Sequence, residues 1–280
     1  MGLALPESLD FYIALLRTIF TRVMNLQLTY FFLKHLIRAK TRHGVHSPFV
    51  YRLVDEVIYD FKPKTVYRDI EQLRNKLLHD KGNIKTIRPR AKSNLDNESA
   101  AFLAKNTLSP ARLAQLIYRL AFDFKPKTVI EFGTSFGINT AYLAKAVPEA
   151  RIISLESQSE IADIVAENLK ELSIYNVQLR TGSFDQLLPA QLEEIEQLDF
   201  VLIEGNRTKE DVLNYFTLCL PKLSENSLMI FKDIYKDREM REAWEKIKLN
   251  SKISVSIDLF YMGLVFVRRG QRKEDFKIRF

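Results

Sequence analysis

Apolar and polar positions alternate differently in the two parts of this chain. Apolar residues recur at helical spacing over residues 8–38, and the same spacing returns over residues 49–59 and 67–79. Farther along, short runs rich in Val and Ile alternate with amphipathic segments of helical length. Such alternation is typical of a doubly wound α/β fold with a mostly parallel sheet. We therefore predict a helical N-terminal region over residues 1–97 and an α/β domain over residues 98–280.

The α/β part contains five candidate parallel strands and a closing pair. The five are Thr128–Phe132, Arg151–Glu156, Val177–Thr181, Phe200–Glu204 and Leu228–Phe231, with helices predicted at Ala111–Phe122, Ser159–Leu172, Lys209–Leu220 and Arg238–Leu249. Only two residues separate Ile253–Phe260 from Gly263–Val267, too few for a parallel crossover, so these segments must form an antiparallel hairpin. The prediction is a seven-stranded sheet. In the N-terminal region, Ser47 and Pro48 predict a capped helix start, and residues 81–97 a polar, basic loop.

Charge is distributed unevenly along the sequence. The 280 residues carry a formal net charge of +7. Residues 1–100 hold 17 Lys and Arg against 10 Asp and Glu, which accounts for all of it. A solvated helical surface explains this excess without a partner. Basic residues and stacking aromatics do not interleave there as in known nucleic-acid-binding modules, so a nucleic-acid partner is not favoured.

A cytoplasmic protein without a membrane span is expected. Cys219 is the single cysteine, which excludes an internal disulfide and fits a reducing compartment. The apolar N-terminal segment is interrupted by Asp10, Arg17 and Arg22. It therefore contains no uncharged run near the roughly 18 residues that a membrane-spanning helix needs. No secretory signal is recognisable.

One stretch of the α/β part carries candidate chemistry. Glu131 lies in the first strand, and Gly133 and Gly137 follow before a helix that begins near Ile138. Glycines let a ligand approach the backbone, and a helix start offers unpaired N–H groups. The spacing differs from the dinucleotide fingerprint because Glu131 replaces its first glycine. A carboxylate there repels a pyrophosphate but suits a cofactor with a cationic amine or sulfonium, and S-adenosylmethionine carries both.

Two further strand ends add to the predicted cofactor site. Glu156 ends the second strand, where an acid hydrogen-bonds the ribose hydroxyls of a nucleoside. Ser183 and Phe184 follow the third strand, where an adenine is usually held. Glu204 ends the fourth strand, at the carboxyl edge where the ligand crevice of such sheets lies.

This set of residues, with the terminal hairpin, resembles the class I S-adenosylmethionine-dependent methyltransferases, and most closely their O-methyltransferase-like branch. Segments 46–51, 239–244 and 257–266 are similar to a narrower, largely uncharacterised bacterial family within that branch. The resemblance implies a Rossmann-like sheet and an enzyme that uses S-adenosylmethionine as cofactor. It assigns the cofactor's amino group to Glu131, its methionine moiety to the loop of Gly133, Thr134, Ser135 and Gly137, its ribose to Glu156 and its adenine to Ser183 and Phe184.

The resemblance also suggests where a metal and a base would lie. Related metal-dependent enzymes place carboxylates after the fourth and fifth strands to hold a divalent cation. The corresponding positions are Glu204 and the pair Lys232 and Asp233, and an ammonium group is a poor neighbour for a dication. We therefore expect no metal. Candidate bases for the acceptor's proton are Glu204, Asp233 and, if the N-terminal region folds over the pocket, His46, which would otherwise cap or pack beside Pro48.

Arg207 and Lys232 are candidate substrate-binding residues. With Arg88, Arg90 and Lys92 they would make the pocket unusually cationic, which favours an anionic small-molecule acceptor because Arg binds carboxylate or phosphate in bidentate fashion. The same residues also fit a catalytically silent homologue that binds only the cofactor or a partner. Surface placement of some of them is a third explanation.

The leading prediction is a cytoplasmic methyltransferase that acts on a small molecule, at oxygen and without a metal. Its N-terminal region would serve as a lid, a substrate wall or the surface of a homodimer. A nicotinamide oxidoreductase is disfavoured by Glu131 and by the absence of the dinucleotide fingerprint. A nucleic-acid methyltransferase would have to use the basic N-terminal third.

Overall fold

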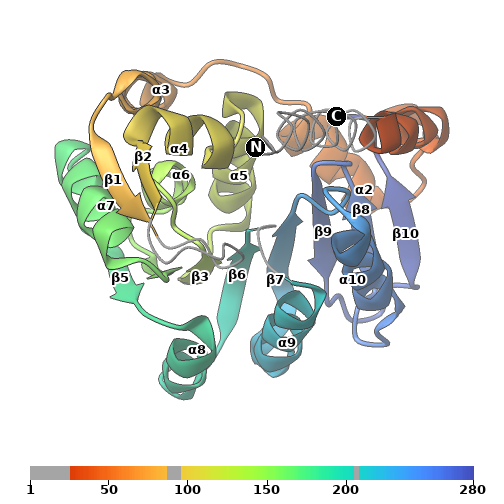
Figure 1. Cartoon of the computed structure of the whole chain (residues 1–280). Coiled ribbons are helices and arrows are strands. Elements are labelled where there is room, and N and C mark those ends of the chain that lie inside the picture. Colours follow the sequence, from red (N-terminus) through yellow and green to blue (C-terminus); the bar gives the residue numbers. More distant parts are fainter. Residues whose placement is uncertain (1–25, 87–95, 205–207) are drawn as a thin grey trace, which may run out of the picture.

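The centre of the molecule is a mixed β-sheet. The computed structural model describes residues 26–86, 96–204 and 208–280. In these ranges the sheet has eight strands in the order β10–β8–β9–β7–β6–β3–β4–β5 (Figure 1). The strands are β3 (Thr128–Phe132), β4 (Arg151–Glu156), β5 (Val177–Thr181), β6 (Leu198–Ile203), β7 (Leu223–Lys232), β8 (Val255–Asp258), β9 (Met262–Phe266) and β10 (Glu274–Lys277). Only β9 runs antiparallel to its neighbours, β7 and β8.

The path of the chain through this sheet reverses at β3. From β3 the chain proceeds to β4 and β5 on one side, and then crosses to β6 on the other side of β3. In open α/β sheets, ligands bind at the carboxyl ends of the strands where the order reverses. A ligand site is therefore expected at the carboxyl ends of β3 and β6. The seven predicted strands and the antiparallel hairpin are confirmed.

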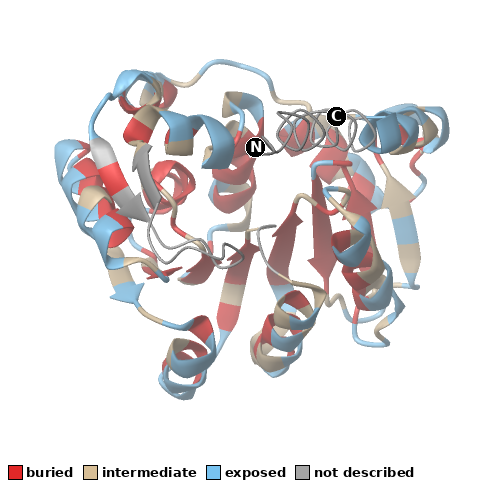
Figure 2. Ribbon diagram, viewed as in Figure 1, coloured by how far each residue is buried: buried red, intermediate tan, exposed pale blue. Residues whose placement is uncertain are grey.

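Helices cover both faces of the sheet. Successive strand residues point to opposite faces, and apolar residues occupy both sets of positions, as expected for parallel strands buried on two sides. Burial accordingly runs through the central strands (Figure 2). One face packs against α5 (Ala111–Phe124), α6 (Ile138–Ala146) and α7 (Ser159–Glu171), and the other against α8 (Phe184–Glu193), α9 (Lys209–Cys219) and α10 (Arg238–Leu249). A short 3₁₀ turn, η3 (Leu220–Lys222), follows α9.

The N-terminal part of the described chain is helical, as predicted. Residues 26–38 form a helix, followed by the 3₁₀ turn η1 (Arg42–Gly44), α2 (Pro48–Arg52), the π-helix η2 (Leu53–Ile58) and α3 (Thr65–His79). The Ser47 hydroxyl accepts a hydrogen bond from the Val50 N–H at 3.5 Å and caps α2, with Pro48 in the first turn. Val54 and Ile70 belong to the hydrophobic cluster that also contains α5 and α6. One core thus includes residues on both sides of the predicted boundary at residue 97.

Several elements differ from the sequence prediction. The prediction of a loop over residues 81–97 was wrong at both of its ends, since β1 (Asn83–Thr86) and β2 (Asp96–Ser99) pair there in a separate antiparallel sheet. Their sequences are polar and give no apolar alternation. The helices α4 (Ala100–Thr107) and α8, and the edge strand β10, were also not predicted. No helix within the described ranges has the length and apolar character needed to cross a membrane.

Candidate functional site

The loop after β3 is wound tightly by three residues with left-handed backbone angles. Gly133 has φ 89°, Ser135 φ 51° and Gly137 φ 80°. A Cβ atom at Gly137 would lie 3.1 Å from a methyl carbon of Val165, so the helix start also requires a residue without a side chain at this position. The Gly133 N–H donates to the Leu155 carbonyl at 2.9 Å, which fixes the loop to the end of β4. The sequence prediction of a glycine turn that opens a helix is confirmed in this form.

Glu131 lies fully buried beneath this loop. Its Oε2 accepts hydrogen bonds from Thr140 Oγ1 at 2.5 Å and Ser154 Oγ at 2.6 Å. The Ser154 hydroxyl is in turn 2.7 Å from that of Thr134. Burial raises the pKa of Glu131 to about 7, although the hydrogen bonds from Ser154 and Thr140 oppose the shift. The carboxylate therefore connects the strand, the loop and the first turn of α6, while its Oε1 has no partner among the described residues.

Glu156 lies at the end of β4 and faces the same loop. Its Oε2 accepts from the Ser135 N–H at 3.0 Å, and its Oε1 accepts from the N–H groups of Ser157 at 2.8 Å and Gln158 at 3.1 Å. These bonds bring the second predicted acid next to the glycine loop. The structure thus unites Glu131, the loop and Glu156 at one edge of the sheet.

The two residues predicted to hold adenine are placed differently from each other. Ser183 is exposed at the start of α8. Phe184 is buried, with its ring centroid 5.9 Å from that of Phe132 and 6.1 Å from that of Tyr215. Phe184 therefore packs into the core beneath the sheet, and Ser183 is the member of the pair that is accessible from outside.

A buried ion pair lies beyond the loop, at the carboxyl ends of β6 and β7. Lys232 Nζ is 2.5 Å from both carboxylate oxygens of Glu204. The Lys232 side chain is 4% exposed and that of Glu204 15% exposed. Asn139 Nδ2, in the first turn of α6, donates to Glu204 Oε1 at 2.7 Å. Burial raises the pKa of Glu204, and the ammonium group of Lys232 opposes that shift.

Asp233 follows Lys232 directly, and a backbone hydrogen bond fixes its position. It has φ 56°, and its N–H donates to the Tyr261 carbonyl at 2.7 Å. The charge of Asp233 is one of the causes that raise the pKa of Glu204. The two predicted carboxylate bases therefore belong to the same group of side chains.

His46 is not brought to this group. It is exposed, and the neighbouring Ser47 hydroxyl accepts a hydrogen bond from Gln271 Nε2 at 3.0 Å. Gln271 follows β9, whose last residue, Phe266, pairs with Leu228. Because Leu228 precedes the carboxyl end of β7 by four residues, His46 lies toward the opposite edge of the sheet from Glu204.

The remaining predicted cations cannot be placed in the site. Arg207, Arg88, Arg90 and Lys92 lie outside the described residues. Lys232 is described, and its ammonium group contacts Glu204. Within residues 26–86, 96–204 and 208–280, no group of three or more His, Cys, Asp or Glu side chains could hold a metal ion.

Comparison with known proteins agrees with this geometry. Residues 130–234, which contain the loop, Glu156, Glu204 and Lys232, match a family described as a methyltransferase domain. This part of the chain is similar to a methyltransferase domain. A catechol O-methyltransferase of Niastella koreensis is 27% identical over 152 residues, which cover 50% of this chain and 68% of the relative.

Solved structures share the fold of this methyltransferase domain. The O-methyltransferase TomG of Streptomyces achromogenes, in complex with SAM, superimposes with a TM-score of 0.53 at 18% identity and covers 78% of this chain and 95% of its own. An O-methyltransferase of Bacillus cereus, in complex with SAH, gives a TM-score of 0.53 at 18% identity, with coverages of 76% and 96%. At identities this low, the superpositions establish a shared fold and nothing more specific.

Sequence reasoning missed a polar chain that links α3 to the methyltransferase domain. The buried Arg74 donates from Nε to Glu71 Oε2 at 2.8 Å and from Nη1 to the Ser109 carbonyl. The Ser109 hydroxyl accepts from Asn139 Nδ2 at 3.2 Å, and Asn139 also contacts the candidate base. The only signal in the sequence was a polar residue, Asn139, in an otherwise apolar helix start. Arg74 resembles any charged residue of an amphipathic helix.

Proposed function

We propose that the chain transfers a methyl group from S-adenosylmethionine to a hydroxyl oxygen of a small molecule, without a metal ion. The observation that carries this proposal is the position of Asn139. It belongs to the first turn of the helix opened by the glycine loop, and it donates a hydrogen bond to Glu204. A cofactor-binding loop and a candidate base are thus joined by one side chain at the switch point of the sheet.

The loop residues fit this cofactor. Gly133, Ser135 and Gly137 have left-handed backbone angles that wind the loop tightly into a cradle, and a Cβ at Gly137 would meet Val165. The unpartnered Oε1 of Glu131 gives that cradle a negative end that suits a cationic group, and Glu156 can accept hydrogen bonds from ribose hydroxyls. When bound, S-adenosylmethionine supplies an electrophilic methyl group. The family match and the neighbours with SAM and SAH support the same assignment.

Glu204 is the proposed base for the proton of the acceptor hydroxyl. A base works best when its pKa approaches the working pH, and burial raises the pKa of Glu204 in that direction. Lys232 and Asn139 fix the orientation of the carboxylate and are positioning residues. Asp233 is the alternative base, because it lies close enough for its charge to affect Glu204.

Lys232 also supplies the reason to propose a reaction without a metal. Its ammonium group already compensates the charge of Glu204, so a dication at the same carboxylate would meet a cation at contact distance. The anionic acceptor, the homodimer and the role of residues 1–97 as lid or wall stay predictions. The contact of Arg74 with Ser109 supports a wall, since it places α3 beside the residues that reach Glu204.

The first test is binding of S-adenosylhomocysteine, S-adenosylmethionine and NAD by calorimetry. We compare the wild type with Gly137→Ala and with the matched control Gly270→Ala. Both glycines have positive φ, but a Cβ at Gly137 would meet Val165 whereas nothing lies within 4 Å of one at Gly270. The adenosyl compounds should bind, with affinity lowered only in Gly137→Ala. Binding of NAD alone would contradict the proposal.

The second test is methyl transfer itself. Purified protein is incubated with S-adenosylmethionine and a panel of catechols and other small hydroxyl compounds, with and without a chelator, and methylated product is measured by mass spectrometry. Product that forms equally in the chelator supports the proposed chemistry. Activity that requires added magnesium would refute its metal-free part.

A catalytically silent homologue is the second candidate, favoured by one observation. Both oxygens of Glu204 already contact Lys232, so the carboxylate has reduced capacity to accept a further proton. Binding of S-adenosylhomocysteine together with no product from any acceptor would favour this function over catalysis.

A further inference from the structure

A cavity lies between the helix of residues 26–38, α10 and the carboxyl end of β10. Its volume is about 440 Å³. Five cationic side chains line it: Lys34, Arg38, Arg241, Lys248 and Lys277, against a single carboxylate, Glu245. None of the residues of the glycine loop, and neither Glu204 nor Lys232, belongs to this lining. The cavity is therefore separate from the candidate methyl-transfer site.

Three of the cations have no ion-pair partner among the described residues, although the charges of Asp237 and Glu242 act on Arg241 from a longer distance. Lys248 Nζ is 2.8 Å from Glu245, and Lys277 Nζ is 2.9 Å from Asp258. For Lys34, Arg38 and Arg241, no carboxylate lies within ion-pair distance among the residues that the structure describes. The guanidinium of Arg241 instead lies 4.2 Å from the ring centroid of Phe31. A cavity with this surplus favours an anionic ligand.

An unsatisfied donor in the wall points to the same kind of ligand. The Trp244 side chain is buried at 1% exposure, and its Nε1 has no hydrogen-bond partner within the described residues. Indole N–H is a donor only, and buried donors normally have an acceptor. Trp244 lines the cavity, and an acceptor on a bound ligand that reaches Nε1 would satisfy it.

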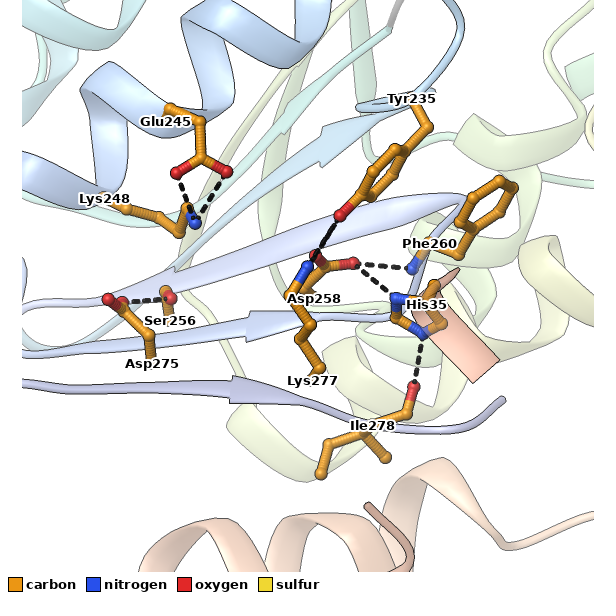
Figure 3. Close-up of polar contacts among 10 residues, drawn as sticks. All are labelled: His35, Tyr235, Glu245, Lys248, Ser256, Asp258, Phe260, Asp275, Lys277 and Ile278. Atoms are coloured by element: carbon orange, nitrogen blue, oxygen red, sulfur yellow. Dashed lines mark hydrogen bonds and ion pairs between the residues drawn. The ribbon is translucent and has the colours of Figure 1, made fainter. Parts of the chain in front are cut away.

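A polar cluster adjoins the cavity through His35, Tyr235 and Lys277, and Figure 3 shows its contacts. Asp258 lies at its centre and accepts from the Tyr235 hydroxyl at 2.8 Å and from Lys277 at 2.9 Å. His35 Nδ1 is 3.4 Å from the same carboxylate. The Tyr235 ring stacks on Phe260 with centroids 4.7 Å apart. These contacts hold Tyr235 in place as an aromatic wall of the cavity. Asp258 forms its ion pair with Lys277 and none with Lys34, Arg38 or Arg241.

We propose that this cavity binds an organic phosphate. Arg38 and Arg241 would hold the phosphate oxygens in bidentate fashion through their guanidinium groups, and Lys34 would add the point charge of its ammonium group. The volume exceeds that of a lone phosphate, and the aromatic residues Phe31, Tyr235 and Trp244 offer a surface for the organic part. Since Tyr235 follows Lys232 by only three residues, an occupied cavity would stabilise the loop after β7.

A phosphate ester reaches such a cavity either in solution or as a lipid headgroup. The helix that contributes Lys34 and Arg38 exposes Leu26, Tyr30, Leu33 and Ile37 along another of its faces. The two sources share one chemistry, and the experiment separates them. Phenyl phosphate and inorganic pyrophosphate serve as soluble probes. Vesicles of phosphatidylcholine, alone or mixed with phosphatidic acid, serve as the lipid probe.

The test compares the full-length wild type with Arg38→Gln/Arg241→Gln. The matched control is Lys40→Gln/Arg238→Gln, which removes two positive charges at exposed positions outside the lining, one just after the helix of residues 26–38 and one in α10. Calorimetry should show saturable binding of phenyl phosphate to wild type and control, weakened about tenfold or more in the cavity variant. Trp244→Phe, which keeps a ring and removes the donor, should also weaken binding and separates loss of the N–H from loss of charge.

Each outcome decides the proposal. Soluble binding that is lost only in the cavity variants supports a soluble phosphate ester. Sedimentation with phosphatidic acid vesicles that is lost only in those variants supports a lipid headgroup. Absence of binding to every probe, or equal weakening in the control, overturns the proposal, because the effect would then be general surface charge. Methyl transfer is not needed for any of these measurements, so failure here leaves the proposed activity untouched.

Discussion

Replacing Lys232 by Met tests whether the buried ion pair organises the site. The change keeps the length of the side chain but leaves the Glu204 carboxylate without its cation. Removing one partner of a buried pair typically costs about 3–5 kcal/mol. Because the Glu204 side chain keeps 15% exposure, we expect the lower end, about 3 kcal/mol. Urea unfolding at about pH 8 measures this loss, and at about pH 5 the loss should shrink, because Glu204 can then take up a proton.

The chain offers a matched control for burial. Lys209 Nζ lies 2.5 Å from Glu242, the same distance, but these side chains are 20% and 39% exposed. Lys209→Met should therefore cost much less stability than Lys232→Met. In Lys232→Met/Glu204→Gln, where no charge is left unpaired, at least half of the lost stability should return. A loss below about 1 kcal/mol for Lys232→Met, or an equal loss in the Glu204→Gln background, would refute the reasoning.

Three further predictions concern the surroundings of the site. Burial raises the pKa of Glu131 from 4.5 to about 7, so the folded state keeps a proton that the unfolded state has lost, and stability falls as pH rises between these values. The Glu131→Gln variant lacks this pH dependence. In urea unfolding, the free energy of unfolding of the variant minus that of the wild type should therefore rise by about 3 kcal/mol between about pH 5 and about pH 8. Gly263→Ala should cost about 1–3 kcal/mol in the same assay, because its Cβ would lie 2.6 Å from the Trp244 ring, and a smaller residue at 244 should relieve the cost. Arg74→Gln should lower the methyl-transfer rate about tenfold through Ser109 and Asn139, with little change in the calorimetric affinity for S-adenosylhomocysteine.

The sheet could be predicted from sequence because its central strands are apolar on both faces. Strands such as β3 and β6 are buried at every position but one and consist mostly of apolar residues, a pattern that is hard to mistake. The strand β10 lies at the sheet edge and contains Glu274, Asp275 and Lys277, so no such run exists. In α8, Pro189 stands inside the helix and suppresses the helical signal. Elements whose stability depends on their neighbours were the ones that the sequence did not reveal.

The site was predictable in its outline for a related reason. Chain order and strand direction place Glu156 and Glu204 at one edge of a parallel sheet, and Glu131 just beneath it, whatever the details of packing. The partners of each carboxylate depend instead on which side chains other elements bring. The hydroxyls of Thr140 and Ser154 donate hydrogen bonds to Glu131, so this carboxylate connects β3 with α6 and β4. Arg74 contacts Ser109 although it lies 35 residues earlier in the sequence. Such contacts leave no periodic pattern to detect.

The ion pair gives the proposed reaction its electrostatic logic. With Lys232 protonated and Glu204 ionised, the pair is neutral, which a largely buried site tolerates far better than an isolated charge. When Glu204 takes the proton of the acceptor hydroxyl, the pair gains one positive charge while the acceptor oxygen becomes negative. The attraction is therefore strongest when the oxygen is most nucleophilic, which is the condition for stabilising a transition state over the bound substrate. On this reasoning Lys232 is needed even though it never exchanges a proton, and Lys232→Met should lose methyl transfer while it still binds S-adenosylhomocysteine.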